Sequence, residues 1–300
     1  MGFTFKSIKY KGIDLLEMPQ KYMDGATIAF DYLEQEHIIH SIEKSVQKIN
    51  EESSYKTDFA IIKMIQSNTR KKFTFFYNVL KIEDIYLPNM DNTNLKRLPL
   101  NGIYYLMDVL SESNTHIDII ITIINNTINP INNLDLYWFL DFDIYGNTYN
   151  KTNLFDLTLD SLSVGMYDSL DTSNSRIYAG LTTIETDFII AKGAGYPNDF
   201  LPDFPERKPK FIESNQPSDY ALGLQFSRKS INPIEDVIIP LSIVVGEGQM
   251  DFVENIKNAQ QKLKILSELH KKMDFSDKRF IVDEKYSKIN TAINKWCRDA

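Results

Sequence analysis

Two aspartates stand two residues apart in the segment NNLDLYWFLDFDIYGNTYN (132–150). Asp141 and Asp143 share its odd-numbered positions with the aromatic residues Tyr137 and Tyr145. Carboxylates can serve as acid and base in glycoside hydrolysis, and they can also accept hydrogen bonds from sugar hydroxyls. Aromatic rings offer a flat apolar face on which a sugar ring can stack. Asp141, Asp143, Tyr145 and Tyr137 are therefore the candidate ligand-binding residues.

The spacing of the two aspartates does not identify a catalytic pair. Residues two apart on one face of a strand lie roughly 7 Å from each other, whatever the function. A solvated face or a polar contact between strands explains the same pattern. Aromatic residues at these positions also suit the second buried face of a central strand. We therefore predict no catalytic residue from the sequence.

The other reactive side chains form no motif that would hold a metal or a cofactor. The four histidines contain no His-Glu-x-x-His arrangement, and the pair His37 and His40 lacks a third ligand. The single cysteine, Cys297, excludes an intramolecular disulfide framework and a cysteine-based zinc site. The glycines of VVGEGQ (244–249) precede no Lys-Ser/Thr pair, so this segment is interpreted as a strand-to-helix turn. We expect no metal and no cofactor.

The candidate residues need a strand to position them, and the segment has the pattern of one. Its even-numbered positions are all large and apolar, which predicts one face in a core: Leu134, Leu136, Trp138, Leu140, Phe142 and Ile144. Similar runs rich in Ile, Phe, Tyr and Thr recur from near the start to about residue 248. Ten or more strands without alternating helices predict a mainly β fold, a large antiparallel sandwich.

The connections between these strands carry their own signals. INNTINPINN (124–133) is rich in turn-forming residues and predicts a hairpin turn between two of the longest strands. Segment 194–217 holds five prolines and predicts a long irregular excursion. Segment 34–50 fits a helix or a strand equally well.

The chain changes character after residue 248. Apolar residues recur at helical spacing over 249–273, and Asp251 followed by Glu254 suits the start of a helix. A second amphipathic helix fits 283–299. The predicted organisation is a β-sandwich domain over 1–248 and a C-terminal helical segment over 249–300.

Charge and hydropathy exclude some partners. The formal net charge is −8, which disfavours binding to nucleic acid and to an anionic membrane surface. The longest apolar runs, such as IDIIITII (117–124), are shorter than the roughly 20 residues that a membrane span requires. The N-terminus lacks an apolar stretch of signal-peptide length. We expect a cytoplasmic protein.

The order of elements and one short motif resemble a known family. Asp141, Phe142, Ile144 and Gly146 match the Asp-Phe-x-Ile-x-Gly run of the N-terminal β-supersandwich in glucoamylase- and trehalase-like glycoside hydrolases of archaea and bacteria. The segments RIYAGL (176–181), GLQFS (223–227) and IIPLSIVVGEGQMDFVENI (238–256) follow in a similar order. The resemblance implies a galactose mutarotase-like sandwich. The catalytic glutamates of that family lie in an (α/α)6 barrel for which this chain shows no pattern, so none can be transferred.

Three functions stay open from the sequence. The first is a non-catalytic carbohydrate-associated module that supports a catalytic domain or binds glycan, with an oligosaccharide, a helical catalytic domain or a second copy of the chain as partner. The second is a structural or assembly protein that acts through protein–protein contacts. The third is a stand-alone glycosidase that uses the strand carboxylates.

Overall fold

The structure is a computed structural model that describes residues 9–11, 13–15, 25–33, 35–39, 60–77, 102–127, 129–144, 153–156, 159–196, 211–212, 216–233 and 235–272. These residues form fifteen strands and one helix. The strands are β1 (Lys9–Tyr10), β2 (Ile13–Asp14), β3 (Gly25–Tyr32), β4 (Gln35–Ile39), β5 (Ala60–Gln66), β6 (Arg70–Tyr77), β7 (Gly102–Leu110), β8 (His116–Asn126), β9 (Ile131–Asp141), β10 (Asn153–Phe155), β11 (Ser163–Asp168), β12 (Ile177–Thr183), β13 (Ile189–Gly195), β14 (Ala221–Ile231) and β15 (Asp236–Glu247). The helix is α2 (Gly248–Lys272).

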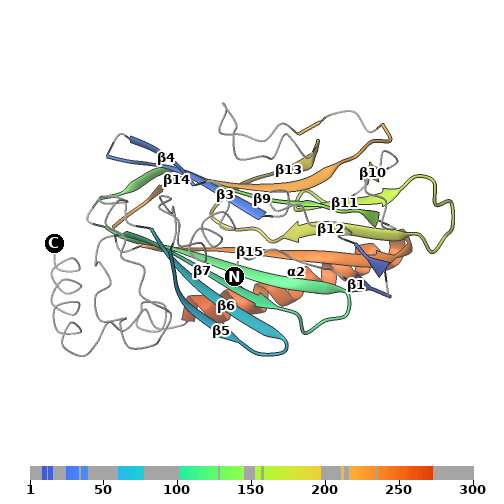
Figure 1. Cartoon of the computed structure of the whole chain (residues 1–300), viewed down its shortest axis with the longest axis horizontal. Coiled ribbons are helices and arrows are strands. Elements are labelled where there is room, and N and C mark those ends of the chain that lie inside the picture. The colour runs from blue at the N-terminus through green and yellow to red at the C-terminus, as the bar shows by residue number, and fades with distance from the viewer. Residues whose placement is uncertain are drawn as a thin grey trace, which may run out of the picture.

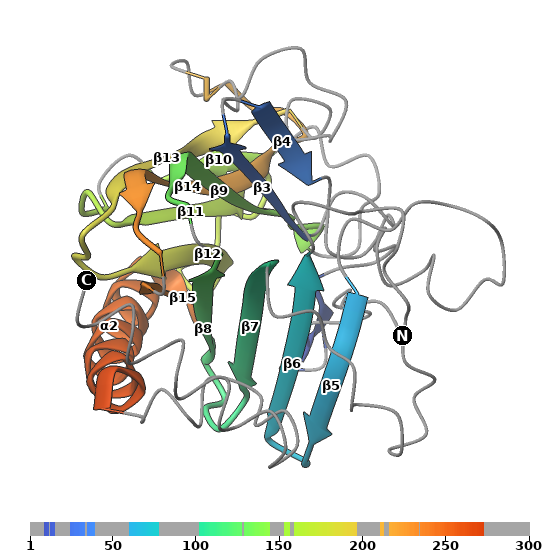
Figure 2. The ribbon, with the colours of Figure 1, turned by 90° about the vertical axis from the view of Figure 1, so that its left-hand side faces the viewer.

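Two antiparallel sheets lie face to face and form a sandwich (Figure 1). The larger sheet has eight strands in the order β10-β11-β12-β15-β8-β7-β6-β5, and the smaller has five in the order β13-β14-β9-β3-β4. Strands β1 and β2 pair only with each other. Helix α2 lies along the outer side of the larger sheet, against β12, β15 and β8 (Figure 2). The predicted fold class, a large antiparallel sandwich with a C-terminal helix, is confirmed.

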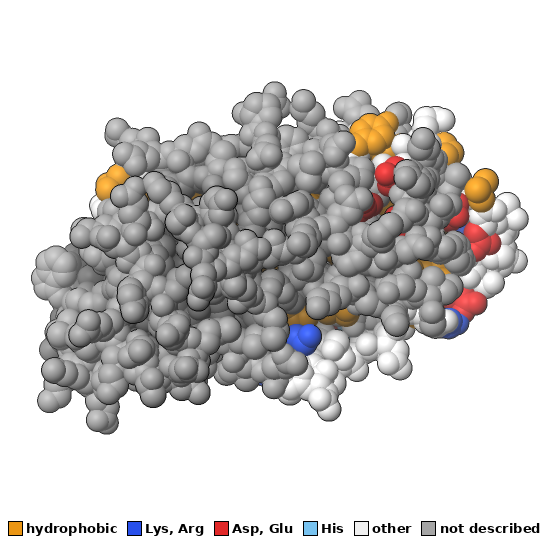
Figure 3. Space-filling view, viewed as in Figure 1, with side chains coloured by type: hydrophobic (Ala, Val, Ile, Leu, Met, Phe, Trp, Pro, Cys, Tyr) orange, Lys and Arg blue, Asp and Glu red, His pale blue; other side chains and the backbone are white. Residues whose placement is uncertain are grey.

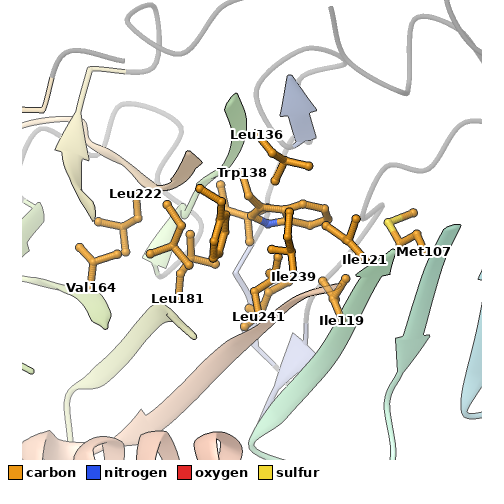
Figure 4. Close-up of a cluster of buried hydrophobic side chains, with 14 of the residues drawn as sticks. Met107, Ile119, Ile121, Leu136, Trp138, Val164, Leu181, Leu222, Ile239 and Leu241 are labelled. Atoms are coloured by element: carbon orange, nitrogen blue, oxygen red, sulfur yellow. The ribbon is translucent and has the colours of Figure 1, made fainter. Parts of the chain in front are cut away.

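The core lies between the two sheets, and the even-numbered side chains of β9 point into it. Leu134, Leu136, Trp138 and Leu140 are almost completely buried and belong to one apolar cluster with side chains of the larger sheet. The ring of Trp138 lies among Ile121 and other aliphatic side chains from both layers (Figure 4). The period of two in this segment therefore identified the buried face correctly.

The hairpin predicted at 124–133 is wrong. Strand β8 pairs with β7 and β15 in the larger sheet, whereas β9 pairs with β14 and β3 in the smaller one. The connection between them therefore crosses from one layer to the other. The side chain of Asn125 secures this corner, because its Nδ2 donates to the backbone oxygens of Asn129, Ile231 and Asn232 at 2.9–3.1 Å. Asn125 is fully buried, so its side-chain amide needs these partners, and the hydrogen bond to Ile231 also satisfies a buried carbonyl.

Helix α2 begins where β15 ends, as the sequence predicted for 244–249. Gly248 has a φ of 78°, a left-handed conformation that favours glycine. The carboxylate of Asp251 accepts a hydrogen bond from the backbone N–H of Glu247 at 2.9 Å, which satisfies a donor at the helix N-terminus. The predicted apolar stripe of the helix is buried against the sheet at five positions: Phe252, Ile256, Ala259, Leu263 and Leu266. Helix α2 is not apolar enough to cross a membrane.

A row of polar side chains crosses the larger sheet beneath the helix. Ser163, Thr182, Ser242 and Asp118 are cross-strand neighbours on four adjacent strands, and all are buried. Ser163 and Thr182 share a hydrogen bond of 2.7 Å between their hydroxyls, and Ser242 Oγ donates to Asp118 Oδ1 at 2.7 Å. Pairing within the row allows these groups to be buried without the cost of an unsatisfied polar atom.

Several predictions fall partly or wholly outside the described residues. Segment 34–50 is a strand at 35–39, and its remainder is not described. The second helix at 283–299 and most of the proline-rich excursion also lie outside the described residues. Two short strands, β10 and β11, were not predicted. The division into domains at residue 248 stays a prediction, although α2 begins at that residue.

Candidate functional site

The sequence-predicted residues lie on and beyond the outer face of the smaller sheet. Tyr137 points away from the core but is only 7% exposed. Asp141 ends β9, and Asp143 follows it, its backbone N–H donating to the oxygen of Leu15 at 2.9 Å. Both aspartates are half-buried. Tyr145 lies outside the described residues.

This outer face is packed rather than open. The carboxylate of Asp135 accepts hydrogen bonds from Gln225 Nε2 at 3.1 Å and from the hydroxyl of Ser227, both on the neighbouring strand β14. Phe139, two same-face positions further along β9, packs against Phe211 from a segment far along the chain. The odd-numbered face of β9 is therefore a second buried face along much of its length. Ligand binding by Asp141, Asp143, Tyr145 and Tyr137 stays a prediction.

A cavity of about 840 Å³ lies elsewhere, beside the C-terminal half of helix α2. Its volume falls within the range of roughly 300–1,000 Å³ that is usual for small-molecule sites. The walls come from Leu162 just before β11, the β12–β13 connection, the end of β14, the start of β15 and one side of α2. The lining residues are Leu162, Ile184, Glu185, Thr186, Asp187, Phe188, Arg228, Glu235, Asp236, Val237, Ile238, Pro240, Gln260, Lys264, Ser267, Glu268 and Lys271. Asp141, Asp143 and Tyr137 are not among them, and Tyr145 lies outside the described residues.

Helix α2 contributes a polar stripe to this cavity. Gln260, Lys264, Ser267 and Lys271 follow one another at spacings of three or four residues, which places them on one side of the helix. The neighbouring stripe is the apolar one that packs on the sheet. The packing of the apolar stripe therefore fixes the direction in which the polar stripe faces.

The opposite wall is the short connection between β12 and β13, in which the chain passes from the larger sheet to the smaller. Its start is held by Thr183, whose hydroxyl donates to the backbone oxygen of Pro240 on β15. Its end is held by a turn in which the N–H of Phe188 donates to Thr186 Oγ1 at 3.1 Å. Glu185 and Asp187 lie between these two anchors and are exposed.

Two ion pairs stiffen the rim of the cavity. The guanidinium of Arg228 pairs with Glu235, donates from Nε to the oxygen of Ser230 at 3.1 Å and lies over the ring of Phe188 at 5.8 Å from its centroid. Lys271 pairs with Glu268 at 3.3 Å on the helix. A cation held over an aromatic ring and against a carboxylate has few alternative positions, so Arg228 is a fixed part of the wall.

Ser267 stands out on the helix side of the cavity. The residue is only 5% exposed, and among the described residues its hydroxyl has no hydrogen-bond partner. A buried hydroxyl without a partner costs free energy, whereas most buried polar groups are paired. Ser267 lines the cavity with its other atoms, because the hydroxyl oxygen itself has almost no accessible surface.

A cluster next to the cavity ties the helix to the edge of both sheets. Gln260 Nε2 donates to Asp160 Oδ2 and to Thr182 Oγ1, each at 3.1 Å, and the ammonium of Lys192 donates to the backbone oxygens of Asp160 and Ser163. Burial alone would raise the pKa of Asp160, but hydrogen bonds from Ser163, Gln260 and a backbone amide lower it. Burial lowers the pKa of Lys192. These contacts hold the cavity wall in place.

Sequence reasoning missed the cavity for an identifiable reason. Its residues come from five segments that are separated by up to about a hundred positions, and no single segment contains a motif. Two signals were present in the sequence. The helical segment 249–273 carries a second, polar stripe, and the short connection IETDF (184–188) places two acidic residues between two strands. Neither signal indicates that the two segments meet.

Among the described residues, no cluster of three or more His, Cys, Asp or Glu side chains has the geometry to hold a metal ion. The carboxylates of the cavity are instead spread along its walls, on the β12–β13 connection, the start of β15 and the helix. This distribution suits hydrogen bonding to a ligand with many polar groups rather than coordination of one ion.

Comparison with known proteins gives distant structural similarity. No protein-family model and no curated protein sequence matches the chain. A candidate kojibiose phosphorylase from the human microbiome aligns with a TM-score of 0.40 and 12% identity over 83% of this chain and 25% of that one. A mutant of the heparan sulfate lyase HepC from Pedobacter heparinus aligns with a TM-score of 0.34 and 11% identity over 64% and 22%. A GalM/aldose epimerase homologue from C. elegans gives a TM-score of 0.37 and 10% identity over 74% and 78%.

Similarity at this level concerns the fold. This chain is distantly similar in structure to β-sandwich proteins among which are a lyase and an aldose epimerase homologue, and it covers about a quarter of the length of the first two structures above. The more specific resemblance, to the N-terminal domain of glucoamylase- and trehalase-like glycoside hydrolases, stays a prediction.

Proposed function

We propose that the chain is a non-catalytic carbohydrate-associated module that binds an oligosaccharide in the cavity beside helix α2. The observation that carries this proposal is the cavity itself, with its volume of about 840 Å³ and its predominantly polar wall. Carboxylates, amides, ammonium groups and hydroxyls from four elements converge there. Sugar hydroxyls donate and accept hydrogen bonds at once, so a wall that offers both kinds of partner suits them.

The side chains of the cavity wall are held in place by their neighbours, which supports a role in binding rather than in catalysis. Arg228 and Glu235 satisfy each other, and the side chain of Gln260 donates to Asp160, Ser163 and Thr182. These groups are positioned before a ligand arrives, which reduces the entropy lost on binding. The sequence-based alternatives, a glycosidase that uses Asp141 or Asp143 and an assembly protein, stay predictions.

Calorimetric titration of the full chain with maltotriose and with trehalose tests the proposal. We expect saturable binding of at least one of them. Lys264→Trp should weaken it about tenfold or more, because an indole there fills part of the cavity. Lys257→Trp is the matched control, since Lys257 is exposed on the same helix but does not line the cavity. Binding of neither sugar, or equal loss in both variants, contradicts the proposed function.

A further inference from the structure

The side-chain amide of Gln260 has a fixed orientation in the cavity wall. Its Nε2 donates to Asp160 Oδ2 and to Thr182 Oγ1, each at 3.1 Å. A third acceptor, Ser163 Oγ, lies 3.4 Å from the same nitrogen. The ionised carboxylate of Asp160 accepts hydrogen bonds and cannot donate them. A rotated amide would place its oxygen against that carboxylate, so the hydrogen-bond network selects one orientation.

The hydroxyls beside Gln260 support the same assignment. Burial alone would raise the pKa of Asp160, but hydrogen bonds from Ser163, Gln260 and a backbone amide outweigh it and lower the pKa. Because Ser163 donates to this carboxylate, its oxygen accepts from the hydroxyl of Thr182, which lies at 2.7 Å. The oxygen of Thr182 then has lone pairs left for Gln260 Nε2. Both hydrogens of that nitrogen therefore meet acceptors.

The other end of the amide, Oε1 of Gln260, is free to contact a ligand. Gln260 lines the cavity and is half-buried, and among the described residues its Oε1 accepts no hydrogen bond. Unlike the hydroxyl of Ser267, this oxygen keeps accessible surface. An amide oxygen has two lone pairs, so Oε1 can accept a hydrogen bond from a ligand without a change of rotamer. An acceptor that is held in place before binding loses little entropy on binding.

A hydrogen-bond donor lies one helical turn away from this acceptor. Lys264 follows Gln260 by four residues and lines the same cavity, so the Cβ atoms of the two residues lie roughly 5–6 Å apart. Lys264 is exposed, and its ammonium makes no ion pair or hydrogen bond with the described residues. An ammonium group has three donors and no acceptor. The helix therefore presents an acceptor and a donor next to each other.

Long-range charge does not select the ligand of this pair. The acidic side chains of the described residues in Figure 3 gather at the right-hand end of the molecule, the opposite end from the cavity. Within the cavity, Arg228 pairs with Glu235, and Lys271 pairs with Glu268. Selection therefore depends on which neighbouring groups of the ligand donate and accept hydrogen bonds.

We infer that Gln260 and Lys264 recognise two adjacent hydroxyl groups of one sugar ring. One hydroxyl donates to Oε1 of Gln260, and its neighbour accepts from the ammonium of Lys264. The inference rests on the proposed function and names the feature of the saccharide that the cavity selects, a free vicinal diol. A sugar that lacks either hydroxyl leaves one protein group without its hydrogen bond, which weakens binding by about three- to tenfold.

The experiment uses monodeoxy analogues of the sugar that binds, maltotriose or trehalose, each of which lacks one ring hydroxyl. In calorimetric titration of the full chain, two analogues that lack adjacent hydroxyls of one ring should bind about three- to tenfold more weakly than the parent sugar. Gln260→Met should abolish the loss for one of these analogues, because the acceptor is then absent. Lys264→Met should abolish the loss for the other.

Gln261→Met is the matched control, because Gln261 is the next residue of the helix, is exposed and does not line the cavity. It should leave both losses unchanged. Losses that survive the substitutions at 260 and 264 overturn the inference, since other groups then recognise the hydroxyls.

The wild type alone can also overturn the inference. Equal affinity for the parent sugar and every analogue does so, as do losses confined to hydroxyls that are not neighbours, and both results leave the proposed function standing. Binding of neither maltotriose nor trehalose overturns the inference and the proposed function together.

Discussion

Replacement of Phe252 by alanine is expected to lower the free energy of unfolding by about 3–5 kcal/mol, measured by urea denaturation. Phe252 is completely buried and joins helix α2 to the larger sheet. Its ring stacks on Tyr178 at a centroid distance of 5.4 Å. The substitution leaves a cavity at the point where the helix begins, so both the transfer free energy and the packing contacts of the ring are lost.

The ring of Phe252 packs against glycines of the larger sheet, so a second substitution can test this packing. A Cβ at Gly165 would lie 2.6 Å from Cε1 of the Phe252 ring, and one at Gly180 would lie 2.8 Å from its Cζ. Gly165→Ala alone should therefore destabilise the protein by about 1–3 kcal/mol through overpacking. In the Phe252→Ala background the added methyl group fills vacated space, so the same change should cost much less.

A double-mutant cycle of Gly165→Ala and Phe252→Ala measures this coupling. We expect a coupling free energy of about 1–3 kcal/mol in the favourable direction. Met250→Ala is the control, because Met250 lies on the same helical turn and is 89% exposed; it should change stability by less than about 0.5 kcal/mol. Additive effects of the two substitutions would show that the ring and the glycine do not meet.

Replacement of Asp108 by alanine is expected to lower the free energy of unfolding by about 2–3 kcal/mol. The residue is 4% exposed, and its carboxylate faces Arg70, Lys72 and the imidazole of His270 beneath the end of helix α2. Arg70 donates from Nε to Oδ1 of Asp108 at 2.9 Å and pairs with Oδ2 through a second nitrogen. The Nζ of Lys72 lies 3.5 Å from Oδ2, and the Nε2 of His270 lies 3.2 Å from the same oxygen. Removal of one partner from a buried ion pair usually costs about 3–5 kcal/mol, and the partial exposure of Arg70 and Lys72 reduces that figure.

The same cluster predicts how stability depends on pH. Burial alone would raise the pKa of Asp108, but the hydrogen bonds from Arg70 and His270 and the charge of Lys72 outweigh it and lower the pKa to about 2. A carboxylate whose pKa is lower in the folded state stabilises the fold above the pKa of the unfolded chain, about 4. That contribution, about 2 kcal/mol, is lost as the pH falls from about 4 to about 2.

The stability difference between the wild type and Asp108→Asn isolates this effect from the other carboxylates. It should be constant above about pH 5 and should shrink below pH 4. Glu112→Gln is the matched control, because its pair with Lys262 is half-exposed and is worth at most about 1 kcal/mol. A difference that stays constant down to pH 2 would contradict the role assigned to Arg70, Lys72 and His270.

The fold could be predicted wherever the periodicity of a segment reflects its surroundings. Strand β9 alternates because one of its faces meets the other sheet, and α2 repeats every three to four residues because one side of it meets β15. The corner between β8 and β9 could not be predicted in this way. Turn-forming residues indicate that the chain changes direction, but they do not say which strand the next one will pair with. The three carbonyl partners of Asn125 include two that lie more than a hundred positions away.

The candidate site was harder still to predict, because local patterns do not show which segments meet in the fold. Asp141 and Asp143 were predicted to bind a ligand because two carboxylates and two aromatic residues share one segment. They do not line the cavity. The cavity exists because the β12–β13 connection crosses between the sheets beside the polar stripe of α2. That juxtaposition depends on tertiary packing, which composition and spacing do not encode. Its local signs were the second stripe on the helix and the acidic connection 184–188.

Amide hydrogen exchange of the full chain, with and without saturating maltotriose, tests the central claim most directly, because it locates the ligand as well as detecting it. We predict slower exchange in the connection 184–188 and in the helical residues 260–271 that line the cavity. Slower exchange confined to residues 135–143 on β9, or no change in any segment at saturating sugar, would contradict the claim that this cavity is the saccharide site.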